Sequence, residues 1–112
     1  MNFYEIIFLI RNEISILDIE KIVSYYKEIV IKLKGTVIFN EYWGIHPIFH
    51  DIKGSKKVHF LLFKVQCTAA MLSKIRENYK YNENIVRGFE IRINDYSNTP
   101  SFMARNLNNN NE

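Results

Sequence analysis

Phe3-Tyr4-Glu5-Ile6-Ile7-Phe8-Leu9-Ile10 is the stretch that decides the fold, and Glu5 is its one charged residue. A strand with one face in water alternates apolar and polar residues, whereas a nearly continuous apolar run is typical of a central strand covered on both faces. Residues 58–65 repeat this pattern, with His59 and Lys64 as the polar exceptions. The sequence therefore predicts two central strands.

Two further stretches alternate in the way typical of half-buried strands. One is 36–43, which we place at an edge of the sheet. Gly44 and Pro47 follow it, and because proline has no N–H to donate to a ladder they predict a distortion between these two positions. The other strand is 85–93, in which Gly88 predicts a local bulge.

Helical periodicity separates these strands. Ser15 and Asp18 each offer an N-cap for a first helix, and Gly35 offers its stop. Thr68 offers the cap of a second helix that ends within 80–82. The apolar stripe of the first helix consists of Ile19, Ile22, Val23, Tyr26, Ile29, Val30 and Leu33, and that of the second of Leu72, Ile75 and Tyr79, with Met71 beside it.

This order of elements predicts an α+β fold, the ferredoxin-like βαββαβ sandwich. Two strand-helix-strand units with right-handed crossovers form a four-stranded antiparallel sheet with two helices on one face. The apolar strands 3–10 and 58–65 take the central places, and the other sheet face has no helix over it. We expect one domain over 1–94. Residues 95–112 contain Pro100 and a run of four asparagines, and we expect a disordered Asn-rich C-terminal tail there.

Composition agrees with a single globular domain and excludes little else. The chain has 112 residues, of which 47% are hydrophobic and 24% charged, which is ordinary for a folded protein. Cys67 is the only cysteine, so an intrachain disulfide is impossible and the cytosol is favoured. The apolar start reaches Arg11 too soon to span a bilayer. A net charge of +3 suits an anionic partner only if the charges cluster.

The chain contains, in this order, Tyr4-Glu5-Ile6, Glu41-Tyr42-Trp43-Gly44, Ile52-Lys53, His59-Phe60 and Tyr79-Lys80-Tyr81-Asn82-Glu83-Asn84-Ile85-Val86-Arg87. These segments resemble the bacterial small-subunit ribosomal protein S6 family. The resemblance covers about 1–94 without large insertions. It implies a structural constituent of the cytoplasmic small ribosomal subunit, without catalysis. It further implies binding to ribosomal RNA of the central domain, in the platform, together with ribosomal protein S18.

Basic residues are the candidates for RNA contact. The three lysines of the turn 53–57 can neutralise phosphates, or can simply form a solvated hairpin tip. By the resemblance, Arg87 matches a family arginine, and Lys80 stands where the family commonly has one. Ile45 and His46 replace the basic pair that usually follows Trp-Gly, which weakens the case for RNA contact there. The candidates are Lys53, Lys56, Lys57, Lys80, Arg87 and Arg92.

Aromatic and apolar residues are the candidates for protein contact. The predicted edge strand offers a sheet edge, and the tail can either be inert or order on a partner. The resemblance favours docking of both on S18. The candidates are Val37, Phe39, Tyr42, Trp43, Tyr96, Phe102, Met103 and Arg105. Phe60 and Phe63 are instead expected in the core, because 57–63 lacks the glycine of the RNA-reading motif of RRM domains.

Other classes receive less support. His46, His50 and His59 lack the companions and spacing of a metal site, and no nucleophile-base pattern or cofactor motif is present, so we expect no enzyme, metal or cofactor. An acylphosphatase-like enzyme would need an arginine in a phosphate cradle. Arg11 follows the first strand, but without glycines around it. The remaining alternative is a ferredoxin-like regulatory or metabolic module that self-associates through its exposed sheet face.

Overall fold

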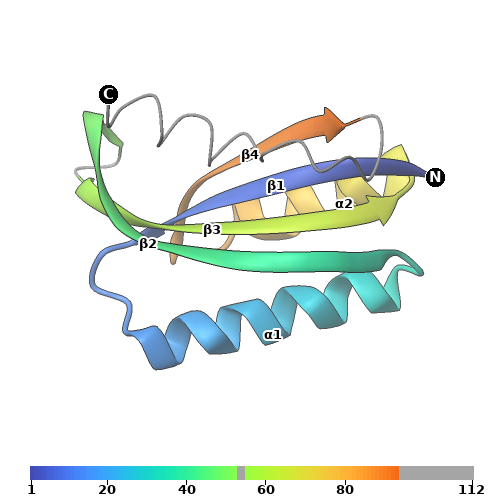
Figure 1. Ribbon diagram of the computed structural model, residues 1–112, viewed down its shortest axis with the longest axis horizontal. Helices are drawn as coiled ribbons and strands as arrows, with labels where there is room; N and C mark the ends of the chain where they lie inside the picture. Colours follow the sequence, from blue (N-terminus) through green and yellow to red (C-terminus); the bar gives the residue numbers. More distant parts are fainter. Residues whose placement is uncertain (53–54, 94–112) are drawn as a thin grey trace.

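The computed structural model describes residues 1–52 and 55–93, with the side chains of 49–52 and 55 left aside. In this part of the chain four strands form one antiparallel sheet in the order β2-β3-β1-β4, and two helices lie against it (Figure 1). The predicted ferredoxin-like α+β fold is confirmed, with β1 and β3 central and β2 at an edge. The elements are β1 Asn2–Arg11, α1 Ile16–Lys32, β2 Thr36–Ile52, β3 Ser55–Cys67, α2 Ala69–Lys80 and β4 Ile85–Ile93.

Side-chain caps start both helices. The Ser15 hydroxyl accepts a hydrogen bond from the Asp18 N–H at 3.2 Å, so Ser15 and not Asp18 is the N-cap of α1. At α2, the Thr68 hydroxyl accepts from the Met71 N–H at 3.2 Å, and the Thr68 N–H donates to the Met71 sulfur at 3.4 Å. Each cap satisfies a backbone donor that the first helical turn leaves unpaired.

The end of α1 differs by one residue from the prediction. Lys34, with φ 73°, takes the left-handed conformation that was expected at Gly35. The Lys34 N–H donates to the Ile31 carbonyl and the Gly35 N–H to the Val30 carbonyl, both at 2.9 Å, which is the Schellman pattern. Gly35 serves close packing instead, because a Cβ there would lie 3.1–3.3 Å from Val30, Gln66 and Cys67.

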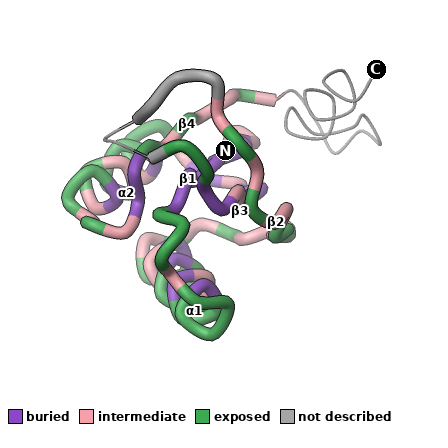
Figure 2. Tube along the Cα trace, turned by 90° about the vertical axis from the view of Figure 1, so that its left-hand side faces the viewer, coloured by how far each residue is buried: buried purple, intermediate pink, exposed green. Residues whose placement is uncertain are grey.

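The two faces of the sheet carry separate apolar clusters. The cluster beneath the helices, the helix-side core, contains Tyr4, Ile6, Phe8, Ile10, Ile19, Ile22, Tyr26, Val30, Leu61, Phe63, Val65, Cys67, Leu72, Ile75, Tyr79 and Ile85. The open-face cluster contains buried Ile7, Leu9, Val58, Leu62 and Val86, with Trp43, Ile48, Phe60 and Ile91 partly buried around it. Figure 2 shows the buried residues concentrated in the central strands and on the inner sides of the helices.

The predicted bulges lie at neighbouring positions. β2 runs through Gly44 and Pro47 as far as Ile52, and 44–47 pair in regular register with 57–60 of β3. The register shifts instead on either side of this segment, between Tyr42 and Gly44 and between Pro47 and Ile52. An edge strand can accommodate Pro47 because its missing N–H need not face a partner strand.

Gly88 does not form the predicted bulge. It pairs regularly with Phe8, and the irregularity between β1 and β4 lies between Leu9 and Ile10. A Cβ at Gly88 would lie within 3.0 Å of three ring carbons of Tyr79. Glycine is therefore required because the tyrosine ring lies against the strand backbone. The prediction that Gly88 is present for a bulge was wrong, since close packing is the reason for it.

Candidate nucleic-acid and partner interface

Exposed cations gather at one end of the molecule. Val58 of β3 pairs with Arg11 at the end of β1, so Lys56 and Lys57 lie beyond this point. Arg87 pairs with Leu9 near the same end, and Lys80 ends the helix that leads into β4. Five exposed cations, Arg11, Lys56, Lys57, Lys80 and Arg87, therefore lie toward this end, which we call the basic end.

Ion pairs among the described residues do not neutralise the basic end. Two pairs occur among the described residues, Lys21 with Asp18 and Arg76 with Glu90, and neither involves a cation of the basic end. Unpaired cations on rigid elements can neutralise phosphates without first losing a protein partner. The electrostatic requirement for an anionic partner is thus met locally, although the net charge of the chain is only +3.

Two predicted RNA contacts do not join this group. Lys53 lies outside the described residues. Arg92 pairs with Tyr4, several residues along the sheet from Arg87, and its guanidinium donates to the Asn2 side chain at 3.1 Å. Arg92 therefore lies toward the opposite end of the sheet, and the structure brings together Lys56, Lys57, Lys80 and Arg87 among the predicted contacts.

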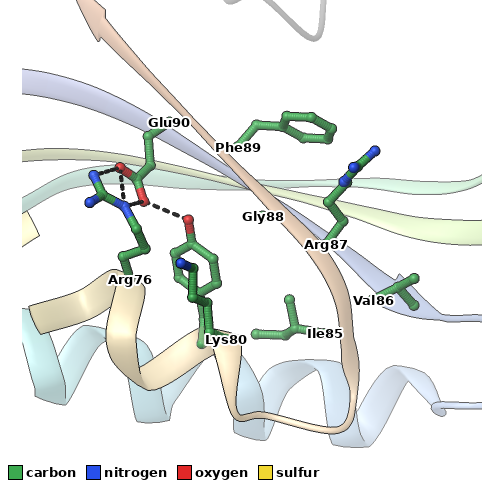
Figure 3. Close-up of a pocket in the computed structure, with 9 residues that line it drawn as sticks. Arg76, Lys80, Ile85, Val86, Arg87, Gly88, Phe89 and Glu90 are labelled. Carbon is green, nitrogen blue, oxygen red and sulfur yellow. Dashed lines mark hydrogen bonds and ion pairs between the residues drawn. The ribbon is translucent and has the colours of Figure 1, made fainter. Parts of the chain in front are cut away.

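β4 divides the basic end into two sides. Arg87 points to the open face beside Phe89, with its guanidinium carbon 5.6 Å from the ring centroid, whereas Lys80 lies on the helix side (Figure 3). Both residues line a hollow of about 490 Å³ along β4 and α2. An extended anionic chain such as RNA can contact Arg87 on one side of β4 and Lys80 on the other. A single small anion is a poorer match for two cations on opposite sides of a strand.

The helix side of β4 holds a polar network that was not predicted. Arg76 donates to Glu90 through Nε at 2.9 Å and also through its terminal nitrogen, and the Tyr79 hydroxyl donates to Glu90 at 2.5 Å (Figure 3). Burial raises the pKa of Glu90, but the hydrogen bonds from Arg76 and Tyr79 and the charge of Arg76 together bring that pKa below its ordinary value. The alternation of β4 could have predicted this network. It places Glu90 on the helix side of the sheet, where a carboxylate needs hydrogen-bond donors.

Arg11 was also missed as a structural residue. Its N–H donates to the Asn84 carbonyl and its guanidinium to the Asn84 side chain, both at 3.0 Å. Arg11 is exposed, and because a neutral amide and not a carboxylate accepts its hydrogen bond, this contact does not neutralise its charge. Arg11 therefore fastens the loop between α2 and β4 to the end of β1 while keeping its charge available.

The predicted partner residues of β2 lie on both faces of the edge. Phe39 and Trp43 lie on the open side, where Phe39 is 36% exposed under the Lys64 ammonium at 5.6 Å. The indole N–H of Trp43 is buried and has no hydrogen-bond partner among the described residues. Val37 packs on the helix-side core, and Tyr42 lies on the same side of β2 but is 40% exposed.

A buried histidine holds Tyr42 in place. The His59 Nε2 lies 2.7 Å from the Ile14 carbonyl, which can only accept, so Nε2 carries a proton. The Nδ1 of the same ring lies 2.7 Å from the Tyr42 hydroxyl and forms a hydrogen bond with it. Burial raises the pKa of Tyr42 above its ordinary value. The edge thus presents an aromatic residue of fixed orientation.

The other expectations divide as follows. Phe63 is in the core as predicted, whereas Phe60 is half-buried on the open face with the ring of His46 edge-on at 5.5 Å. No group of three metal-binding side chains occurs among residues 1–52 and 55–93. The helices described by the structure are too short or too polar to cross a membrane. The tail candidates Tyr96, Phe102, Met103 and Arg105 lie outside the described residues.

Similarity to known proteins agrees with this architecture. The family model of ribosomal protein S6 matches residues 3–92. The small ribosomal subunit proteins bS6 of Rickettsia canadensis and Rickettsia prowazekii are 38% and 35% identical over 106 residues, which cover 95% of this chain and 88% of each relative. A crystal structure of 30S ribosomal protein S6 from Thermotoga maritima has the same fold, with a TM-score of 0.76 at 19% identity, covering 98% of this chain and 96% of that one.

These matches confirm the resemblance drawn from the residues. Proteins of this family are non-enzymatic constituents of the small ribosomal subunit and are cytoplasmic in bacteria, in agreement with the expected class and location. The family model covers both helices and nearly all of the four strands, and leaves out residues 93–112. The chain therefore belongs to the ribosomal protein S6 family.

Proposed function

We propose that this protein binds small-subunit ribosomal RNA of the central domain, in the platform, as a heterodimer with ribosomal protein S18. The observation that carries the RNA part is the basic end, with Lys56, Lys57, Lys80 and Arg87 exposed and outside the ion pairs of the described residues. Lys53 and Arg92 are further proposed contacts. Arg92 would contact a different part of the RNA, because it lies toward the other end of the sheet.

The S18 contact is proposed along the free edge of β2 and through the C-terminal tail. Phe39 and Tyr42 are exposed aromatic residues on the two sides of this edge, and Val37 and Trp43 complete the apolar strip. We further propose that the tail, 95–112, is disordered alone and orders on S18 through Tyr96, Phe102, Met103 and Arg105. Disordered segments that fold on binding can cover a large surface in this way.

Cooperation between the two proteins is expected because the basic end is small. Each phosphate neutralised by a cation adds roughly one unit to the salt dependence of binding. A few such contacts give weak affinity alone. Two joined proteins present their contacts as one multivalent surface, and their affinity then exceeds that of either protein.

The test is a titration of a central-domain RNA fragment with this protein, with S18 and with both, at two salt concentrations. We expect tight, salt-sensitive binding for the mixture alone. Tight binding by this protein without S18, or a mixture no better than either protein, would contradict the proposal. A chain truncated after Asp95 should keep its fold and lose affinity for S18, and unchanged affinity would remove the tail from the interface.

One observation favours self-association as a second candidate. Phe89 is 43% exposed on the open face, next to the apolar residues of the open-face cluster. A second copy could cover this surface, and such a homodimer would not need S18. Light scattering separates the two cases: a monomer that becomes a heterodimer with S18 supports the ribosomal proposal, and a stable homodimer supports the alternative.

A further inference from the structure

Tyr81, in the connection between α2 and β4, is 84% exposed, more than any other large hydrophobic residue described. A single exposed apolar residue needs no explanation by itself. Tyr81 differs because it is held on a rigid connection at the basic end of the molecule. It directly follows Lys80, and Arg87 lies six residues further along the chain.

Hydrogen bonds hold this connection on both sides of Tyr81. The Tyr81 N–H donates to the Asn78 carbonyl at 3.2 Å as α2 ends. The Asn82 side chain donates to the Tyr26 hydroxyl of α1 at 3.1 Å and accepts from the Asn84 N–H at 3.0 Å. Arg11 fixes Asn84 from β1. The backbone around Tyr81 is thus tied to α1, α2 and β1.

Such a tyrosine is well suited to bind a flat aromatic group. Because the backbone is already ordered and the side chain has only two torsions, little conformational entropy is lost when the ring stacks. The nearby cations favour a partner that carries negative charge next to its rings. Glu83 is the one acidic residue in the connection, opposed by Arg11, Lys80 and Arg87 at the same end.

We propose that Tyr81 stacks on an unpaired base of the RNA, while Lys80 and Arg87 contact the flanking phosphates. This inference rests on the proposed function and adds a contact that its basic residues do not supply. Single-stranded RNA offers both features, since its bases can be turned out and stacked on aromatic side chains. A rigid duplex with all bases paired would leave Tyr81 without a partner.

The test uses the complete chain with S18 and the central-domain RNA fragment, at two salt concentrations. Tyr81→Leu keeps an apolar side chain but removes the aromatic ring, and we expect it to weaken RNA binding by about 5-fold to about 150-fold. The salt dependence should not change, because no charge is lost. Tyr81→Phe keeps the ring and should bind within about twofold of the parent.

Two further sets of variants serve as controls. Lys80→Gln and Arg87→Gln should weaken binding and also reduce the salt dependence, by about one unit for each phosphate contact. Tyr25→Leu makes the same exchange of ring for aliphatic chain at another exposed tyrosine, on α1, and should leave RNA affinity unchanged. Thermal unfolding of each variant verifies the fold.

Each remaining outcome overturns the stacking. If Tyr81→Leu binds RNA as well as the parent while the Lys80 and Arg87 variants are weakened, the proposed function stands and stacking does not. If Tyr81→Phe loses as much RNA affinity as Tyr81→Leu, the contact is made by the hydroxyl and not by the ring. If Tyr25→Leu loses as much, the effect is not specific to Tyr81. Loss of S18 binding without RNA would place Tyr81 in the protein interface. If the parent mixture does not bind RNA, both the proposed function and the stacking of Tyr81 are wrong.

Discussion

The two faces of the same sheet are stabilised differently. On the helix side, Phe8 is 1% exposed and its ring centroid lies 4.8 Å from that of Tyr26, 5.2 Å from Tyr79 and 5.7 Å from Phe63. On the open face, five residues are buried mainly by their neighbours in the sheet, and Phe89 beside them is 43% exposed. The sheet therefore has a fully enclosed core on one side, whereas on the other side its buried apolar residues lie next to an exposed aromatic ring.

The largest effect is expected from truncating one phenylalanine on each face. Phe8→Ala should lower the free energy of unfolding by about 3–5 kcal/mol, because it removes a fully packed ring from the helix-side core. Phe89→Ala should lower it by less than about 1 kcal/mol, since Phe89 is already 43% exposed. Urea unfolding measures both. Equal losses would mean that the open face is as important to stability as the helix-covered one.

The second prediction tests how tightly the helix side is packed. Gly88→Ala should lower the free energy of unfolding by about 1–3 kcal/mol, because its Cβ must displace the Tyr79 ring. Gly44→Ala at the edge is the matched control. There the added Cβ would make only an ordinary contact, 4.0 Å from His46 Nε2, and the left-handed backbone, φ 82°, would cost about 1 kcal/mol. A Gly88→Ala protein as stable as the parent would show that the ring moves freely.

A third, smaller effect concerns the charge buried on the helix side. Glu90→Gln should lower the free energy of unfolding by about 1–2 kcal/mol at pH 7, since it weakens the bonds from Arg76 and Tyr79. Because the folded-state pKa of Glu90 is lowered, the unfolded chain takes up the proton first as pH falls. The stabilisation is complete above the ordinary pKa of 4.5 and is lost as pH falls through the lowered value.

Urea midpoints of the parent and Glu90→Gln proteins between pH 7 and pH 3 measure this linkage. The difference should be largest at neutral pH and shrink in acid. Glu77→Gln, at an exposed position of α2, the helix that carries Arg76, is the control and should give no comparable difference. A constant gap between the parent and Glu90→Gln at every pH would show that packing, not charge, is responsible.

The smallest effect is a gain in stability. Lys34 occupies the left-handed position after α1, where an L side chain is disfavoured and glycine is not. Lys34→Gly should raise the free energy of unfolding by up to about 1 kcal/mol. Lys32→Gly, two residues earlier at the end of the helix itself, should lower it by about the same amount. Equal signs for the two variants would contradict the assigned helix end.

The strands and helices were predictable because their signals are periodic and repeated. The apolar runs around Ile7 and Leu62 placed β1 and β3 in the centre, and the caps Ser15 and Thr68 placed both helix starts. The bulges were predicted at the wrong positions, because a glycine in a strand can indicate either an unusual backbone torsion or close packing. Only the neighbouring Tyr79 decides between these at Gly88.

The candidate site was less predictable. Basic residues could be named, but whether they gather depends on strand register, which brought Lys57 and Arg87 toward one end and Arg92 toward the other. The bond from Arg11 to Asn84 joins residues 73 positions apart, and no local pattern indicates it. The exposure of Tyr81 likewise follows from how its connection is held.

The central position of β1 has a consequence for how the protein is made. β1 is synthesised first, yet its two neighbours, β3 and β4, come from the second half of the chain. Its apolar residues therefore have no strand partner until β3 has left the ribosome that makes the protein, and both edges of β1 are paired only after Ile93 has emerged. We expect folding to follow completion of the chain, with a long-lived need for chaperone protection of the nascent N-terminus.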